Sequence, residues 1–143
     1  MDALVLNDWA LTPCPCGRTD PQQGKKGRVL ALARCCGLHL GEPSRIPDAE
    51  ALMRSRYTAF VLGRVDHLTL TWHPSTLPAD LALEPGQKWL GLEVRQHRQL
   101  DATHAEVEFV ARSRVGGKGV RLHERSRFVH QNGQWWYVDG DML

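Results

Sequence analysis

All four cysteines of this chain lie between residues 14 and 36, as a Cys14-Pro15-Cys16 pair and an adjacent Cys35-Cys36 pair. Two such pairs can turn four sulfurs toward one metal ion, which is the ligand set of a structural zinc site. A site closed by four protein ligands leaves no position for water or substrate, so we expect the metal to stabilise the fold. Eighteen residues, Gly17 to Arg34, separate the two pairs, and a gap of this length adds little to the cost of loop closure.

Disulfides and unrelated free thiols are the alternatives to a metal site. Residues 1–12 lack a positive region followed by an apolar run, and no stretch reaches the apolar length of a membrane span. We therefore expect a cytoplasmic protein with no membrane span, and a reducing compartment disfavours disulfides. His39, three residues after Cys36, is a substitute for the fourth ligand.

Length and charge limit the class of protein further. The chain has 143 residues, enough for one domain with a small appendage. Its formal net charge of +2 is close to balance, so the overall field would not draw it onto nucleic acid or membrane. Basic residues are dense in two places only, the cysteine segment (Arg18, Lys25, Lys26, Arg28 and Arg34) and one strand face (Arg121, Arg125 and Arg127).

Two helices are predicted after the cysteines. Asp48 is a suitable N-cap and Gly63 a suitable stop, so the first helix should run over residues 49–62. A second helix is expected over residues 65–71, because Pro74 ends it.

The first of these helices has one apolar face. That face consists of Ala49, Leu52, Met53, Ala59 and Phe60, with Tyr57 at its margin. Arg56 falls in the middle of the apolar face, whereas Arg54 and Thr58 project from the opposite side.

Alternating apolar residues predict four strands in the second half of the chain. They cover residues 88–97, 103–112, 120–130 and 134–139, and turn signals at Gly116-Gly117 and Asn132-Gly133 join the last three. The expected inner face carries Leu90, Leu92, Val94, Ala105, Val107, Phe109, Ala111, Val120, Leu122, Glu124, Ser126 and Phe128. Two helices followed by an antiparallel meander predict an α+β fold.

Several strings of this chain resemble those of one family. Cys14-Pro15-Cys16-Gly17 with Cys35-Cys36-Gly37 resembles the SEC-C motif, a small zinc-binding element, and the resemblance continues through residues 52–57, 71–76, 89–92, 124–128 and 133–140. Over nearly its whole length the chain is similar to the YchJ family of small bacterial proteins. The resemblance implies a SEC-C-like segment, residues 1–41, and a cone-shaped nuclear transport factor two-like domain, residues 42–143, with helices packed on a curved antiparallel sheet.

Arg56 and Glu124 are charged residues at positions expected to face the core. An unpaired buried ion is costly, so we predict that the two contact each other, either as the floor of a pocket or as a structural ion pair. Trp72 and His73 at the end of the second helix are further pocket candidates. No catalytic residue is assigned, because no nucleophile set or second metal cluster can be assembled from the sequence.

Two classes of function follow. In the first, which the sequence favours, the protein is an adaptor that binds a protein or RNA partner through its basic residues, with no sequence-specific reading of DNA. In the second, the cone cavity lined by Arg56, Trp72, His73 and Glu124 holds a small ligand or substrate. A filled interior with an exposed basic surface would favour the adaptor, and an open cavity with an aromatic wall would favour the ligand binder. The resemblance also allows a homodimer through the outer sheet face, and whether the protein is an enzyme stays undecided.

Overall fold

The computed structural model describes residues 10–24 and 26–143. Three short 3₁₀ helices come first, η1 (Leu32–Arg34), η2 (Cys36–Leu38) and η3 (Pro43–Arg45), followed by the α-helices α2 (Ala49–Leu62) and α3 (Val65–Thr71). The strands β1 (Lys88–Gln99), β2 (His104–Val115), β3 (Lys118–Gln131) and β4 (Gln134–Met142) form one antiparallel sheet in that order. The predicted α+β fold, two helices on a four-stranded antiparallel sheet, is confirmed.

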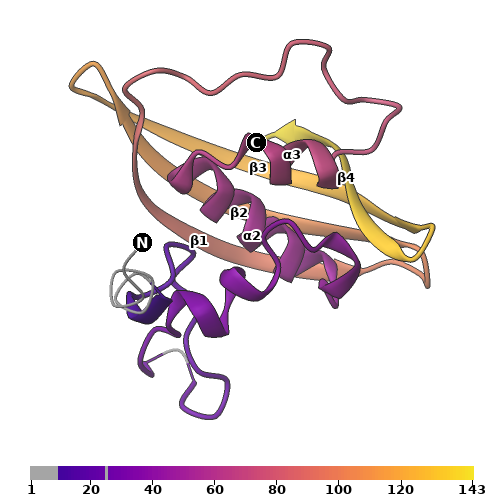
Figure 1. Ribbon diagram of the computed structural model, residues 1–143, viewed down its shortest axis with the longest axis horizontal. Coiled ribbons are helices and arrows are strands. Elements are labelled where there is room, and N and C mark those ends of the chain that lie inside the picture. The colour runs from indigo at the N-terminus through magenta and orange to yellow at the C-terminus, as the bar shows by residue number, and fades with distance from the viewer. Residues whose placement is uncertain (1–9, 25) are drawn as a thin grey trace, which may run out of the picture.

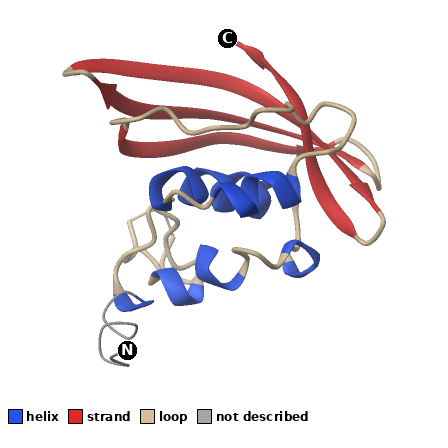
Figure 2. Cartoon of the chain, turned by 45° about the horizontal axis from the view of Figure 1, so that its top comes forward, coloured by secondary structure: helices blue, strands red, loops and turns tan. Residues whose placement is uncertain are grey.

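The described part of the chain has three layers, and α2 is in the middle layer (Figures 1 and 2). The sheet covers one side of the two α-helices, and the cysteine segment lies on the other side. Nine of the fourteen residues of α2 are buried, so this helix has no wide solvent face. Side chains on its two sides can therefore belong to two different sites.

Local signals fix the ends of α2 where the sequence predicts them. The Asp48 carboxylate accepts a hydrogen bond from the Ala51 N–H at 2.8 Å, which satisfies one of the free donors of the first turn. Gly63 ends the helix with φ of +74°, a left-handed conformation that glycine adopts without a steric penalty.

Strand alternation is correct on β2 and wrong at one place on each of β1 and β3. Ala105, Val107, Phe109 and Ala111 are all buried, as predicted. Val120 of β3, predicted to face inward, is 44% exposed close to the turn at Gly116-Gly117. Leu90, predicted to face inward, is 49% exposed. The reason is a register shift between Trp89 and Gly91, because a bulge reverses the faces of the residues on one side of it.

A long connection, residues 72–87, joins α3 to β1 and starts against β4 (Figure 1). The His73 N–H donates to the Tyr137 carbonyl at 2.8 Å, and Trp72 forms an isolated parallel bridge with Tyr137. The Thr76 hydroxyl donates to the Val138 carbonyl. These contacts hold Trp72 beside Tyr137.

Within residues 10–24 and 26–143, no helix is long and apolar enough to cross a membrane.

Candidate metal centre and ligand cavity

The four cysteines form one buried cluster. Their sulfurs all lie within 4.8 Å of one another, and the Cys16 and Cys35 sulfurs are 3.6 Å apart. Four thiolates at about 2.3 Å from a tetrahedral ion have sulfurs about 3.8 Å apart, whereas disulfide sulfurs are about 2.0 Å apart. The geometry fits a metal ion and not a disulfide. Among the described residues the cluster consists of these cysteines alone, and His39 is not part of it.

Main-chain pairing brings the two cysteine pairs together. Isolated antiparallel bridges join Pro13 to Ala31 and Thr19 to Val29. The Cys14 N–H donates to the Leu30 carbonyl at 2.8 Å. The residues between Cys16 and Cys35 thus form a small hairpin that returns to its starting point.

The thiols of the cluster affect one another's ionisation. Hydrogen bonds from the thiols of Cys16, Cys35 and Cys36 lower the pKa of Cys14. The interaction with Cys14 raises the pKa of Cys36, and burial adds to that rise. One thiolate is therefore stabilised at the expense of the others, and ionisation of all four needs a metal ion among them.

Two side chains of α2 join this cluster to the helix. The Arg54 guanidinium donates from Nη1 to the Cys16 carbonyl at 3.0 Å and from Nε to Glu50 at 2.8 Å. The Cys14 sulfur lies 3.7 Å from the Thr58 hydroxyl oxygen. Arg54 and Thr58 are the residues predicted to project away from the apolar face, and the cysteine segment occupies that side.

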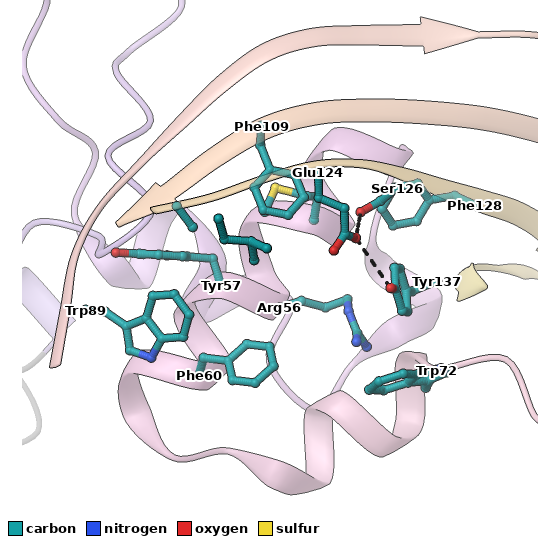
Figure 3. Close-up of a pocket in the computed structure, with 13 residues that line it drawn as sticks. Arg56, Tyr57, Phe60, Trp72, Trp89, Phe109, Glu124, Ser126, Phe128 and Tyr137 are labelled. Atoms are coloured by element: carbon teal, nitrogen blue, oxygen red, sulfur yellow. Dashed lines mark hydrogen bonds between the residues drawn. The ribbon is translucent and has the colours of Figure 1, made fainter. Parts of the chain in front are cut away.

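On the other side of α2, a cavity of about 240 Å³ lies between the helix and the sheet (Figure 3). Tyr57 and Trp89 lie at one end of it, and Trp72 and Tyr137 lie at the other. Leu122 and Glu124 on its wall are only half-buried, so the cavity reaches solvent. Its lining consists of Met53, Arg56, Tyr57, Phe60, Trp72, Trp89, Phe109, Ala111, Leu122, Glu124, Ser126, Phe128 and Tyr137.

Arg56 is a buried cation in the wall of this cavity, with 7% of its surface exposed. Its Nη1 donates to the Leu68 carbonyl at 3.0 Å and to the Thr71 hydroxyl at 2.8 Å. Its guanidinium carbon lies 4.8 Å from the ring centre of Trp72 and 4.4 Å from that of Tyr137. Burial lowers its pKa to about 10, which leaves it charged at neutral pH.

Glu124 also lines the cavity, from β3, with hydroxyl groups as its partners. One carboxylate oxygen, Oε2, accepts from the Ser126 hydroxyl at 2.5 Å and from the Tyr137 hydroxyl at 3.4 Å (Figure 3). Burial, followed by the charge of Glu124, raises the pKa of Tyr137 to about 12, so Tyr137 stays a neutral donor.

The predicted contact between Arg56 and Glu124 is wrong. Both residues line one cavity, but within residues 10–24 and 26–143 no hydrogen bond or ion pair joins them. The carbonyl of Leu68 and the hydroxyl of Thr71 at the end of α3 hold the guanidinium instead. Tyr137 lies between the two groups, since it contacts the face of one and donates to the other.

Of the remaining pocket candidates, Trp72 lines the cavity and His73 does not. The His73 Nδ1 accepts from the Ser75 N–H at 3.1 Å, and its Nε2 lies 2.9 Å from the Gln131 side-chain oxygen. These contacts fix the ring at the start of the long connection.

Acidic neighbours accompany most of the basic candidates on the sheet. Arg127 binds Asp139 at 2.6 Å and Asp141 at 2.7 Å, and Arg125 lies 3.5 Å from Glu108. Arg121 is exposed opposite Arg112. In the cysteine segment Lys26, Arg28 and Arg34 are exposed, Arg18 is half-buried, and Lys25 lies outside the described residues.

Sequence reasoning missed much of the aromatic wall. Phe60 and Phe109 appeared only as core residues, and Tyr57 only at a margin, yet all three line the cavity. Trp135, by contrast, is buried elsewhere, against His130. The only available signal was the combination of large aromatic residues with a charged residue on one predicted face.

Comparison with known proteins gives a consistent family and fold. The sequence profile described as "YchJ, middle NTF2-like domain" matches residues 48–140, which run from the cap of α2 into β4. A UPF0225 protein of Polaromonas naphthalenivorans is 61% identical over 134 residues, covering 92% of this chain and 98% of that protein. A UPF0225 protein of Bordetella pertussis is 51% identical over 134 residues, covering 90% and 92%.

Two solved structures share the fold over most of the chain. The solution structure of a SEC-C motif containing protein from Rhodopseudomonas palustris is 30% identical, with a TM-score of 0.72, and the match covers 92% of this chain and 99% of that one. The crystal structure of a SEC-C motif containing protein from Psychrobacter arcticus is 29% identical, with a TM-score of 0.67 and coverages of 92% and 82%.

Proposed function

This chain belongs to the YchJ family, the UPF0225 proteins, and on that premise we propose that it is a zinc-stapled module that binds a small ligand between α2 and the sheet. The observation that carries the proposal is the cavity of about 240 Å³ with an aromatic wall and two charged side chains. An apolar cavity of about 150 Å³ is large enough for benzene. Drug-sized ligands occupy pockets of about 300–1,000 Å³, so the expected ligand is smaller than these.

The metal in this proposal is zinc, bound by Cys14, Cys16, Cys35 and Cys36. Four buried sulfur donors within 4.8 Å of one another favour zinc among the common divalent ions. The SEC-C motif in the names of the two similar structures is consistent with that choice. When bound, the ion supplies no chemistry beyond holding the two cysteine pairs together, since four protein ligands complete its coordination.

The cavity favours ligand binding over the adaptor role. An adaptor was expected to have a filled interior and an exposed basic surface. Here the interior is open, and acidic residues engage Arg125 and Arg127, although Arg121, Lys26, Arg28 and Arg34 are exposed. Binding of a protein or RNA partner, and pairing into a homodimer, stay predictions.

We test the proposal with toluene and benzyl alcohol as probes, observed by NMR through the indole N–H signals. Trp72 and Trp89 line the cavity, so both signals are expected to shift and saturate. Ala111 is 2% exposed and also lines the cavity, and Ala111→Phe should fill it and abolish the shifts.

Ala102→Phe, in the exposed turn between β1 and β2, is the matched control and should bind as the natural chain does. If neither probe shifts the Trp72 and Trp89 signals, or if Ala111→Phe leaves binding intact in a folded protein, the cavity is not a ligand site.

A further inference from the structure

The cavity contains more hydrogen-bond donors than its own acceptors satisfy. Arginine carries five N–H groups, and the hydrogen bonds of Arg56 to Leu68 and Thr71 both come from Nη1. Within residues 10–24 and 26–143, no acceptor bonds Nε or Nη2. The Trp72 indole N–H is buried and also lacks a partner there.

Arg56 and Trp72 are neighbours at one end of the cavity, and the buried Trp72 N–H is not open to the cavity. The Arg56 guanidinium points toward the end formed by Trp72 and Tyr137 (Figure 3) and lies against both rings. The two ring centres are only 5.1 Å apart, so both rings lie on the same side of the guanidinium. A buried donor without an acceptor is unfavourable, so this end is suited to a group rich in acceptors.

Glu124 is the acidic group that faces the same cavity, and neighbouring hydroxyl groups donate to its carboxylate. Its Oε2 already accepts from Ser126 and Tyr137. Arg56, in contrast, has no anionic partner within hydrogen-bonding distance among the described residues. Arg56 is therefore the group that lacks a partner of opposite charge at hydrogen-bonding distance. The N–H groups along one edge of an arginine match the two oxygens of a carboxylate.

The opposite end of the cavity is aromatic. The Tyr57 and Trp89 ring centres are 5.4 Å apart, and those of Phe60 and Trp89 are 5.6 Å apart. Phe109 adds a further ring from β2. Such a wall favours a flat apolar body about the size of one ring.

We infer that the cavity binds a small monocarboxylic acid with one ring, its carboxylate at Arg56 and its ring among Tyr57, Phe60 and Trp89. This inference rests on the proposed function. It adds the chemical class of the ligand and the orientation in which the ligand lies.

Three probes of matched shape test the inference: phenylacetate, its neutral amide phenylacetamide, and the cation phenethylamine. Each is titrated into the full chain while the Trp72 and Trp89 indole signals are observed. Phenylacetate should bind at least about tenfold more tightly than phenylacetamide, because a charged hydrogen bond at a buried arginine is lost in the amide. Phenethylamine should bind most weakly.

Two variants assign the contacts without removing Arg56, whose loss could prevent folding. Trp72→Phe is the control, because it keeps an aromatic ring beside Arg56 and removes only a buried N–H, so it should leave phenylacetate and toluene nearly unchanged. Glu124→Gln removes a negative charge that faces the ligand, so it should tighten phenylacetate and leave phenylacetamide nearly unchanged.

The outcomes separate the two levels of the proposal. If toluene and benzyl alcohol bind but phenylacetamide or phenethylamine equals or exceeds phenylacetate, the inferred ligand class is wrong and the ligand site remains. If Glu124→Gln weakens phenylacetate, the assigned orientation is wrong. If none of the five probes shifts the cavity signals, both the proposed function and this inference fail.

Discussion

At the scale of single residues, two arginines two positions apart on α2 face different sites. Arg54 donates to Glu50 and to the Cys16 carbonyl on the side of the cysteine segment. Arg56 donates to Leu68 and Thr71 and lies against two neighbouring aromatic rings on the side of the cavity. Arg54 bonds a carboxylate directly, whereas the charge of Glu124 acts on Arg56 without a hydrogen bond, so Arg56 keeps free donors for a ligand.

The Glu124 side chain occupies space beside Gly140 of β4, which is free because glycine has no side chain. A methyl group there would lie 2.7 Å from Glu124 Cδ and 2.9 Å from Cγ. Gly140→Ala should displace the carboxylate from Ser126 and Tyr137 and lower the free energy of unfolding by about 1–3 kcal/mol. Gly91→Ala on β1 is the control, because a methyl group there meets nothing within 4 Å. Urea denaturation of both variants checks this, and equal losses would contradict it.

His67 makes stability depend on pH. The ring is fully buried, its Nδ1 accepts from the Gly41 N–H at 3.0 Å, and its Nε2 lies 2.8 Å from the Ser55 hydroxyl oxygen. Burial, followed by the charges of Arg56 and Arg64, lowers its pKa from 6.5 to about 4. The folded state therefore favours the neutral ring. Its contribution is complete above pH 6.5 and is lost as pH falls toward 4, because the unfolded chain binds the proton first.

The size of this effect follows from the pKa difference. A shift from 6.5 to about 4 corresponds to about 3 kcal/mol of unfolding free energy. Between pH 7 and pH 4, the unfolding free energy of the natural chain should fall by about 3 kcal/mol more than that of His67→Gln. The glutamine amide can replace both hydrogen bonds and does not titrate. Denaturant unfolding at each pH measures the difference, and parallel losses in the two proteins would rule out His67 as the cause.

Sequence patterns placed individual side chains on the correct face more reliably than they paired them. Arg56 and Glu124 do face the same interior space, because helix and strand periodicity determine the direction of a side chain. The prediction that they contact each other was wrong, because Arg56 instead donates to the carbonyl of Leu68 in α3. That arrangement depends on how α3 packs against α2, and no local pattern encodes it.

At the scale of elements, the helix and strand boundaries were the most predictable feature. Asp48 and Gly63 are strong local end signals, and α2 begins and ends at them. The hairpin between the cysteine pairs was not predicted, because its bridges join residues that show no strand alternation. The second buried face of α2 was also missed, since Thr58 and Ser55 have side chains typical of a solvent face, yet both are fully buried.

At the scale of the whole molecule, α2 is the only helix of the described chain that contacts both the cysteine segment and the cavity. Thr58 and Arg54 meet the segment, and Tyr57 and Arg56 meet the cavity. We therefore expect a disturbance on the metal side to reach the ligand side through α2.

Metal removal tests this connection. The purified reduced protein should carry one zinc per chain by elemental analysis. Stripping the metal with a chelator should lower the melting temperature and speed amide hydrogen exchange in α2, while exchange in β2 and β3 changes less. Adding zinc back should restore the melting temperature, and adding magnesium, the control, should not. Absence of stoichiometric zinc, or α2 exchange unaffected by its removal, would contradict the prediction.

The hairpin inside the cysteine segment also affects how such metal elements can be recognised. Because the bridges from Pro13 to Ala31 and from Thr19 to Val29 hold the two cysteine pairs in place, residues can be added at the tip of the hairpin without moving the sulfurs. We therefore expect the segment between the pairs to tolerate changes in length. A pattern that demands a fixed short spacing would overlook chains of this kind, whereas one that allows a paired insert would find them.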